Sequence, residues 1–330
     1  MESLQPDRNL ALELVRVTEA AAISAARLMG RGDKNAGDGA AVDAMRSFLK
    51  TVQMDGRVVI GEGEKDEAPM LYNGEWVGSG KGPAVDVAVD PVEGTNLLAY
   101  GRDHAIAVIA VSERGTMWDP APSLYMKKLV VPPAARHVID IRQSAGENLE
   151  QIAGALQRPV TDLTVFVLDK PRHAGLIEEI RKTGARITLH TDGDVMGALL
   201  AAIPGTGVDV MMGTGGTPEG VITAAAVKAL GAGMQGMRDP QLESEKQELV
   251  RLGADLSAVI GLDDLIRSDN TFFAATGITG GSFLEGVHFD RSGGVTTHSL
   301  VIRSKTGSLR YIKGVHQLGK KGLESLSGHH

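Results

Sequence analysis

Two acidic residues stand three positions apart in the segment VDVAVDPVEGTN, residues 85–96. The apolar run before Asp90 predicts a strand that ends at this residue, and a proline stiffens the turn that leads to Glu93. Two carboxylates on one tight turn suit hard divalent cations, which prefer oxygen ligands. Taken alone, the segment is equally compatible with an ordinary acidic turn.

Acidic residues recur among glycines at three other points. Glu62 follows a predicted strand in the sequence GEGE, and Glu219 begins a predicted helix after GTGGTP. Asp38 precedes another predicted helix, and helix capping would explain either Asp38 or Glu219 taken singly. Four such acidic clusters together favour a shared metal site, in which two metals about 3.5–4 Å apart hold a phosphate and activate an attacking water.

The elements that would position these residues fall into two groups. The first half of the chain predicts two helices followed by strands of a first sheet. The helices are expected at about 10–30 and 38–52, and the strands at 57–60, 85–89 and 105–111. A proline-rich stretch at 131–133 and a polar segment at 142–148 predict a boundary, which gives domains 1–145 and 146–330.

The second half alternates strands with helices, which indicates βαβ units and a parallel sheet. Strands are expected at 163–168, 186–189 and 208–212, with helices at 173–182, 195–203 and 219–230. The loops that leave these strands, DKPRH, TDGD and GTGGTPEG, should meet at one crevice, because ligands bind outside the carboxyl ends of such strands. Apolar runs at 272–276, 283–289 and 295–302 predict further strands.

Composition excludes several classes of function. The 330-residue chain has 34 basic and 41 acidic residues and a net charge of −7, which is the wrong sign for holding nucleic acid by charge. Cysteine is absent, which excludes disulfides and thiolate chemistry. The longest apolar runs are far below the roughly 18 residues of a membrane span, and the first residues do not read as an export signal. We therefore expect a cytoplasmic protein with neither a nucleic-acid nor a membrane partner.

The ordered motifs resemble those of one known family. GRGDKNAGDGAAVDAM, VVIGEGEKDEAPMLY, VAVDPVEGTN, YMKKL, KPRH, DGD, GGTPEGV and ATGIT are similar, in this order, to the class II or GlpX-type fructose-1,6-bisphosphatases, from about residue 10 to 316. DPVEGT is also a variant of the D-P-x-D-G-T turn of the wider inositol-monophosphatase-like, lithium-sensitive superfamily. The resemblance implies a layered α/β sugar-phosphatase fold with two packed, sheet-containing subdomains.

The same resemblance implies an activity. It predicts hydrolysis of the 1-phosphate of fructose 1,6-bisphosphate in gluconeogenesis, with Mg²⁺ or Mn²⁺ required, by a homo-oligomer, either a dimer or a tetramer. The implied metal ligands are Asp38, Glu62, Asp90, Glu93 and Glu219. The implied substrate contacts are Glu93, Gly94, Thr95, Tyr125, Lys170, Pro171, Arg172, Asp192, Gly193, Asp194 and Gly216.

Residue types suggest the individual roles. The Thr95 hydroxyl would orient the attacking water and pass a proton to Asp38 or Asp66. Lys170 and Arg172 would hold the distal phosphate, since the planar guanidinium suits it. Asp192 and Asp194 would accept hydrogen bonds from sugar hydroxyls, and the N–H groups of Gly94 and Thr95 would cradle the leaving phosphate if a helix starts there. Two alternatives stay open: an enzyme that also hydrolyses sedoheptulose 1,7-bisphosphate, and a non-catalytic sugar-phosphate or metal-binding protein.

Overall fold

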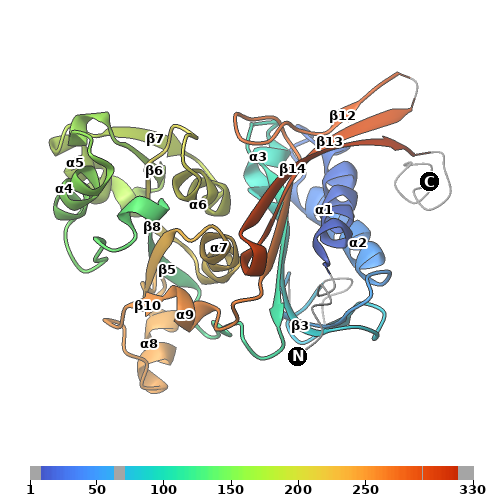
Figure 1. The fold of residues 1–330 in the computed structure, drawn as a ribbon, viewed down its shortest axis with the longest axis horizontal. Helices are drawn as coiled ribbons and strands as arrows, with labels where there is room; N and C mark the ends of the chain where they lie inside the picture. Colours follow the sequence, from blue (N-terminus) through green and yellow to red (C-terminus); the bar gives the residue numbers. More distant parts are fainter. Residues whose placement is uncertain (1–8, 63–70, 292, 319–330) are drawn as a thin grey trace, which may run out of the picture.

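The computed structural model describes residues 9–62, 71–291 and 293–318. Five layers alternate between helices and sheets (Figure 1). Helices α1 (Ala11–Ala26) and α2 (Lys34–Leu49) cover the outer face of the first sheet. Helices α6 (Asp194–Ala202) and α7 (Thr217–Ala229) fill the space between the two sheets. Helices α4 (Ala145–Leu156) and α5 (Ala174–Lys182) cover the second sheet. The predicted layered α/β fold is confirmed.

The first sheet has the strand order β12-β13-β11-β4-β3-β1-β2, with β14 paired to β13. The pairing of β1 with β3 is parallel and the other pairings are antiparallel. The strands are β1 (Asp55–Ile60), β2 (Trp76–Val77), β3 (Ala84–Glu93), β4 (Ile106–Glu113), β11 (Phe272–Gly277), β12 (His288–Phe289), β13 (Gly294–Arg303) and β14 (Ser308–Gln317).

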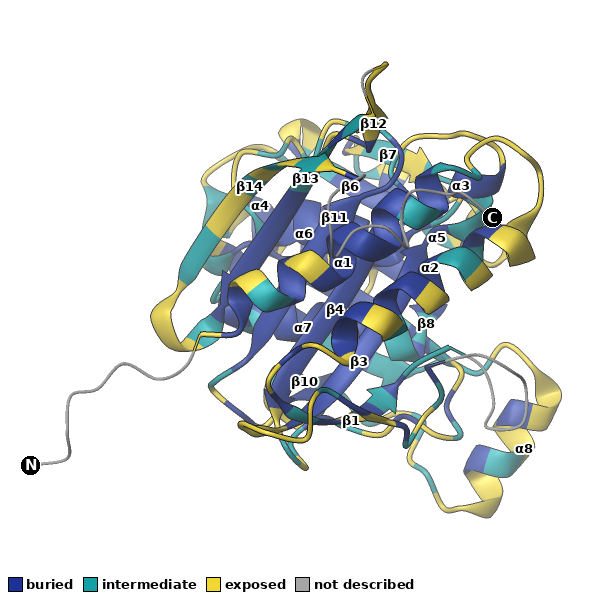
Figure 2. Ribbon diagram, turned by 90° about the vertical axis from the view of Figure 1, so that its right-hand side faces the viewer, coloured by how far each residue is buried: buried dark blue, intermediate teal, exposed yellow. Residues whose placement is uncertain are grey.

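Strand β4 shows why the central strands of this sheet have apolar residues on both faces. Ala107 and Ile109 contact the core beneath α1, whereas Ile106 and Val108 contact the core around α6 and α7. Successive side chains of a strand point to opposite faces, so a strand covered on both sides must be apolar throughout. Figure 2 shows this burial, with the central strands buried and much of α8 (Glu243–Arg251) exposed.

The second sheet has the order β10-β9-β5-β8-β6-β7. Strand β6 pairs in parallel with β7 and β8, as predicted, whereas β5 is antiparallel to β8 and β9. The strands are β5 (Tyr125–Val131), β6 (Thr164–Leu168), β7 (Arg186–His190), β8 (Val210–Gly216), β9 (Gly233–Arg238) and β10 (Ile260–Gly261). The short helices α3 (Thr95–Ala99) and α9 (Leu262–Leu265) complete the α-helices of the described residues.

The two sheets do not divide the chain at residue 145. Strand β5 precedes this point but belongs to the second sheet, and β11–β14 return to the first sheet from the far end of the chain. The polar segment predicted as a boundary instead begins α4, because Ser144 and Glu147 form a capping box.

Helix α2 also begins earlier than expected. Asp33 accepts a hydrogen bond from the Ala36 N–H and caps the helix, which therefore starts at Lys34. Asp38 lies inside the helix, so the capping interpretation of Asp38 is wrong. Because Asp33 caps the helix, the Asp38 side chain is not used for capping.

Candidate active site

The end of β3 carries the acidic pair that the spacing singled out. The strand continues through Glu93, and its pairing with β4 becomes irregular between Asp90 and Glu93. Asp90 Oδ1 accepts a hydrogen bond of 3.0 Å from the Val92 N–H. Gly94, at φ +88°, then turns the chain into α3, which begins at Thr95. This left-handed conformation favours glycine at the turn.

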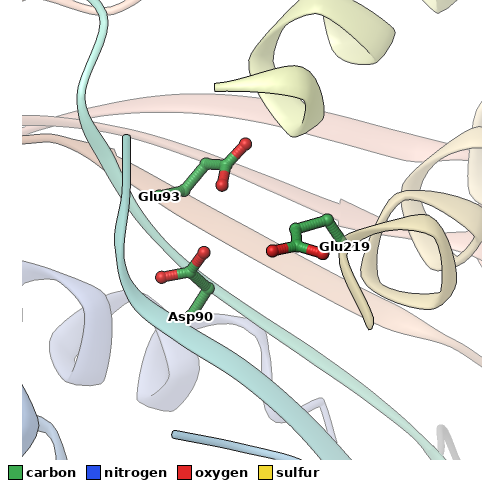
Figure 3. A group of neighbouring side chains, drawn as sticks. All are labelled: Asp90, Glu93 and Glu219. Carbon is green, nitrogen blue, oxygen red and sulfur yellow. The ribbon is translucent and has the colours of Figure 1, made fainter. Parts of the chain in front are cut away.

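Glu219, from the first turn of α7, completes a compact cluster with this pair. One carboxylate oxygen each of Asp90, Glu93 and Glu219 lies within 4.8 Å of the others, and the three side chains face one another (Figure 3). Glu219 Oε2 is buried and has no hydrogen-bond partner in the described part of the chain. A cluster of carboxylates with an unpartnered buried oxygen fits a divalent cation.

Burial sets the protonation of this cluster in the absence of a cation. It raises the pKa of Asp90 well above the ordinary value, and repulsion from Glu93 adds to the effect. The pKa of Glu93 is raised to about 8, mainly by burial and to a smaller extent by repulsion from Asp194. Burial also raises the pKa of Glu219, and the positive charge of the nearby Lys128 partly offsets this increase. Because the three acids repel one another, a bound cation would stabilise their ionised forms.

Asp38 and Glu62 adjoin the cluster. Burial raises the pKa of Glu62 to about 7, and repulsion from Asp38 and Glu219 contributes. Burial raises the pKa of Asp38 to about 6, against a lowering effect of its hydrogen bond with Thr95. Of the five residues that the resemblance implied as metal ligands, Asp90, Glu93 and Glu219 form one compact cluster, and Glu62 interacts electrostatically with both Asp38 and Glu219. Asp66, the alternative proton acceptor, lies outside the described residues.

Helix α6 supports the cluster from the side of the second sheet. The Val195 N–H donates a 2.8 Å hydrogen bond to Glu93 Oε1. One residue earlier, Asp194 Oδ2 lies 2.6 Å from Lys128 Nζ, and these side chains are only 4% and 1% exposed. Asp194 is therefore committed to an internal ion pair through one oxygen. Its other oxygen, Oδ1, is buried without a partner among the residues that the structure describes.

The loops after β6 and β7 meet, as predicted, whereas β8 continues to Gly216 and is followed directly by α7, which begins at Thr217. The Asp169 N–H donates to the His190 carbonyl at 2.7 Å, and Lys170 Nζ lies 3.9 Å from Asp192 Oδ1. Asp192 also accepts a 2.8 Å hydrogen bond from the Asn96 side-chain amide, which links this region to α3. Gly193 and Gly216 occupy the positions immediately before α6 and α7, and Pro171 begins the 3₁₀ turn Pro171–His173.

Arg172 lies beside Tyr125 at the end of β5. Its Nε and Nη2 atoms donate to the Thr214 carbonyl at 2.9 and 2.7 Å, and its guanidinium carbon lies 5.5 Å from the Tyr125 ring centroid. The N–H groups of Leu124 and Tyr125 both donate to Glu245 Oε1. Arg172 and Tyr125 are thus neighbours. A backbone carbonyl holds the Arg172 side chain, and the Glu245 carboxylate holds the backbone of Tyr125.

Sequence reasoning assigned no role to Lys128, Asn96 or Glu245. Lys128 had a detectable signal, because β5 carries two consecutive lysines among apolar residues, and a lysine that is buried in such a strand must be paired. Asn96 and Glu245 had none, because their partners lie about a hundred residues away in the sequence.

A layered α/β protein with a buried carboxylate cluster and nearby cationic side chains is typical of metal-dependent phosphoryl-transfer enzymes. The family model described as bacterial fructose-1,6-bisphosphatase, glpX-encoded, matches residues 8–316, and the chain belongs to this family. Among its relatives is the fructose-1,6-bisphosphatase 1 class 2 of Escherichia coli K12, which is 46% identical over 96% of this chain and 98% of the relative. The fructose-1,6-bisphosphatases class 2 of E. coli strain CFT073 and Shigella flexneri match with the same identity and coverage.

Proposed function

We propose that this protein hydrolyses the 1-phosphate ester of fructose 1,6-bisphosphate to fructose 6-phosphate and inorganic phosphate, a step of gluconeogenesis. The observation that carries the proposal is the compact cluster of Asp90, Glu93 and Glu219, with Thr95 two residues after Glu93. The names of the relatives, which the chain covers almost completely, supply the substrate.

The five carboxylates would hold Mg²⁺ or Mn²⁺. When bound, the metal would supply positive charge for the phosphate oxygens and lower the pKa of the attacking water. The Thr95 hydroxyl, 3.3 Å from the Val92 carbonyl oxygen, would orient that water, and Asp38 would accept its proton. Asp66 is the alternative acceptor. Water adds to phosphorus, the bond to the sugar oxygen breaks, and this oxygen takes up a proton.

The rest of the proposed site would bind the sugar and its distal phosphate. Lys170, Arg172 and Tyr125 would hold the distal phosphate, because the two cations are two residues apart in the chain and Arg172 lies beside the Tyr125 ring. The sugar would contact Asp192 and the glycines before α6 and α7. Asp194 would act mainly through the placement of α6, since Lys128 already occupies one of its oxygens.

The distal-phosphate assignment has its own test. Replacing Arg172 with alanine removes a charge-assisted contact worth about 1.5–3 kcal/mol, so kcat/KM for the bisphosphate should fall roughly 10- to 150-fold. A substrate without the distal phosphate, such as fructose 1-phosphate, should hardly change. Equal losses on both substrates would place Arg172 at the reacting end or in the fold instead.

Phosphate release from a panel of sugar phosphates, with Mg²⁺, with Mn²⁺ or with chelator, tests the activity. We expect metal-dependent release from fructose 1,6-bisphosphate. Comparable turnover of sedoheptulose 1,7-bisphosphate would identify a dual enzyme. Binding without turnover of any sugar phosphate would refute the enzyme assignment.

Three further properties belong to the proposal. The D-P-x-E-G-T turn and the alternating layers support kinship with the inositol-monophosphatase-like superfamily. We place the activity in the cytoplasm, because highly charged sugar phosphates do not cross membranes unaided. Among the described helices, none is long and apolar enough to span a bilayer. We also expect a homo-oligomer, and light scattering that detects only the 34.7 kDa chain would contradict this.

A further inference from the structure

The parallel ladder between β6 and β8 ends before the strands do. Its register pairs Val165 with Val210 and Phe166 with Met211, and no later pair of β6 and β8 is recorded, although β8 continues to Gly216. The N–H and C=O groups of one strand residue point to the same neighbouring strand. The backbone groups of Thr214 that face β6 must therefore find other partners or remain unsatisfied.

The imidazole of His173 is inserted at this point. Its Nδ1 lies 2.7 Å from the Leu168 carbonyl oxygen at the end of β6, and its Nε2 accepts a 2.7 Å hydrogen bond from the Thr214 N–H of β8. The residue is 3% exposed. A carbonyl partner requires a donor at Nδ1 and an N–H partner requires an acceptor at Nε2, so both contacts hold only in one neutral tautomer.

The surroundings of the ring favour this neutral form. Burial lowers the pKa of His173, and the adjacent Arg172 lowers it further. Gly213, at φ +135°, brings the backbone of β8 against the ring, since a Cβ at this position would lie 3.0 Å from Cε1 and Nε2. The backbone of β8, which the imidazole binds through the Thr214 N–H, therefore also restricts the position of the ring.

The carbonyl of Thr214 accepts hydrogen bonds from Nε and Nη2 of Arg172, the residue that precedes His173 in the chain. Two consecutive side chains of one 3₁₀ turn thus satisfy both backbone groups of Thr214. A second support holds the same residue, because the Thr214 hydroxyl donates a 2.5 Å hydrogen bond to Asp239. The Asp239 N–H in turn donates to the Tyr125 carbonyl at 3.0 Å.

We propose that His173 is a positioning residue for substrate binding: by bridging Leu168 and Thr214 it fixes the carbonyl that orients the Arg172 guanidinium toward the distal phosphate. This inference rests on the proposed function for the role of Arg172. It assigns no direct contact with substrate to His173, whose ring nitrogens are both occupied by backbone groups.

The first test compares His173→Leu with His173→Gln in the Mg²⁺-loaded enzyme. Leucine removes both hydrogen bonds, whereas the glutamine amide offers one donor and one acceptor in similar positions. For His173→Leu we expect KM for fructose 1,6-bisphosphate to rise about 10-fold with kcat nearly unchanged, and kcat/KM for fructose 1-phosphate to change less than about 3-fold. His173→Gln should recover part of the loss.

The route through Arg172 is tested by a double-mutant cycle. In the Arg172→Ala background, His173→Leu should cause no further loss of preference for the bisphosphate, because the group that it positions is gone. Ile180→Ala, a truncation in the buried face of α5, is the control for a general loss of stability and should leave the preference for the bisphosphate unchanged. Equal losses on both substrates, or an additive loss in the double mutant, would overturn the proposal.

A spectroscopic measurement separates this inference from the proposed function. In ¹⁵N-labelled protein we expect His173 to carry its proton on Nδ1, and the Nε–H resonance of Arg172 to shift in His173→Leu and to move back in His173→Gln. If Arg172→Ala leaves the preference for the bisphosphate unchanged, the distal-phosphate role fails, and the same resonance still decides whether His173 holds Arg172. An unaltered Arg172 Nε–H signal in His173→Leu would refute the positioning role.

Discussion

Thr95 is the residue at which the geometry most directly suggests chemistry. Its hydroxyl lies 3.3 Å from the Val92 carbonyl oxygen and interacts with the Asp38 carboxyl, and Thr95 is the first residue of α3, two residues after Glu93. Burial raises the pKa of Asp38 to about 6 in the metal-free protein. A hydroxyl that can donate to one group while accepting from water fits the orientation of a nucleophile.

Replacement of Thr95 by serine and by alanine tests this role. Thr95→Ser keeps the hydroxyl and should retain activity. Thr95→Ala should lower kcat by about 10²- to 10⁴-fold, the range of a missing general acid or base interaction, with KM largely unchanged. Steady-state kinetics on fructose 1,6-bisphosphate measure both constants. An alanine variant with a kcat close to that of the parent enzyme would remove Thr95 from the mechanism.

The junctions between strands and helices decide where the acidic groups lie. At the junction of β8 and α7, a Cβ on Gly216 would lie 1.8 Å from Glu219 Oε2, so the carboxylate occupies the space of the missing side chain. Gly216 has φ −65° and ψ 140°, which any residue adopts. The absence of a side chain, rather than the backbone conformation, is what the site uses.

Gly216→Ala should therefore displace the flexible Glu219 side chain and spare the fold. We expect the metal concentration for half-maximal activity to rise about 10- to 100-fold, as when a group that supports a metal ligand is lost. The melting temperature should change little. Gly175→Ala is the matched control, since a Cβ there meets nothing within 4 Å, and it should leave metal activation unchanged. Normal metal activation of Gly216→Ala would show that Glu219 is not a ligand.

The ion pair between Lys128 and Asp194 connects β5 with the start of α6. Removing one partner of a buried pair leaves an uncompensated charge, so Lys128→Met should lower the free energy of unfolding by about 3–5 kcal/mol. Lys182→Met, which breaks the exposed pair with Glu178, should cost less than about 0.5 kcal/mol. Urea denaturation measures both values.

A double substitution checks the cause of that loss. Adding Asp194→Asn to Lys128→Met removes the stranded charge and should restore much of the stability. If Lys128→Met proved no more destabilising than Lys182→Met, the buried pair would not connect β5 with α6 energetically.

On the scale of the whole molecule, the acidic site makes the free energy of unfolding depend on pH and on metal binding. The pKa values of Glu62 and Glu93 are about 7 and 8, above the value of about 4.3 for an unfolded glutamate. The metal-free folded state then binds more protons than the unfolded state in this range. The contribution of these two groups to its free energy of unfolding is therefore complete below about pH 4.3, decreases as the pH rises above that value, and is lost once the pH has passed through the folded pKa values.

We accordingly expect the melting temperature in chelator to fall between about pH 6.5 and pH 8.5, and stabilisation by Mg²⁺ or Mn²⁺ to grow over the same range. Burial lowers the pKa of His173, and partial burial lowers the pKa values of His104, His190 and His316, so these groups change protonation below this window. Differential scanning calorimetry with and without metal measures the effect, and Glu93→Gln should flatten the pH dependence. Equal metal stabilisation at both ends of the range would contradict the assignment of the cluster.

The sequence alone determined the elements whose signals are local. The alternation before Asp90 predicted β3, and the βαβ pattern predicted β6–β8 with their helices, because periodicity and turn residues act between near neighbours. The spacing of Asp90 and Glu93 also predicted that they act together, since three residues on a tight turn cannot separate far.

Tertiary structure alone decided the rest, because those choices depend on contacts between distant residues. The placement of β5 in the second sheet rests on pairings such as Tyr125 with Gly216, and the return of β11 to the first sheet rests on pairings such as Ile106 with Gly277. Similarly, the Lys128 ammonium can pair with Asp194 only when β5 packs against α6. His173 can bind the Thr214 N–H only where the pairing of β6 with β8 has ended. Burial then sets the charge of each group, and no local sequence pattern specifies how deeply a side chain is buried.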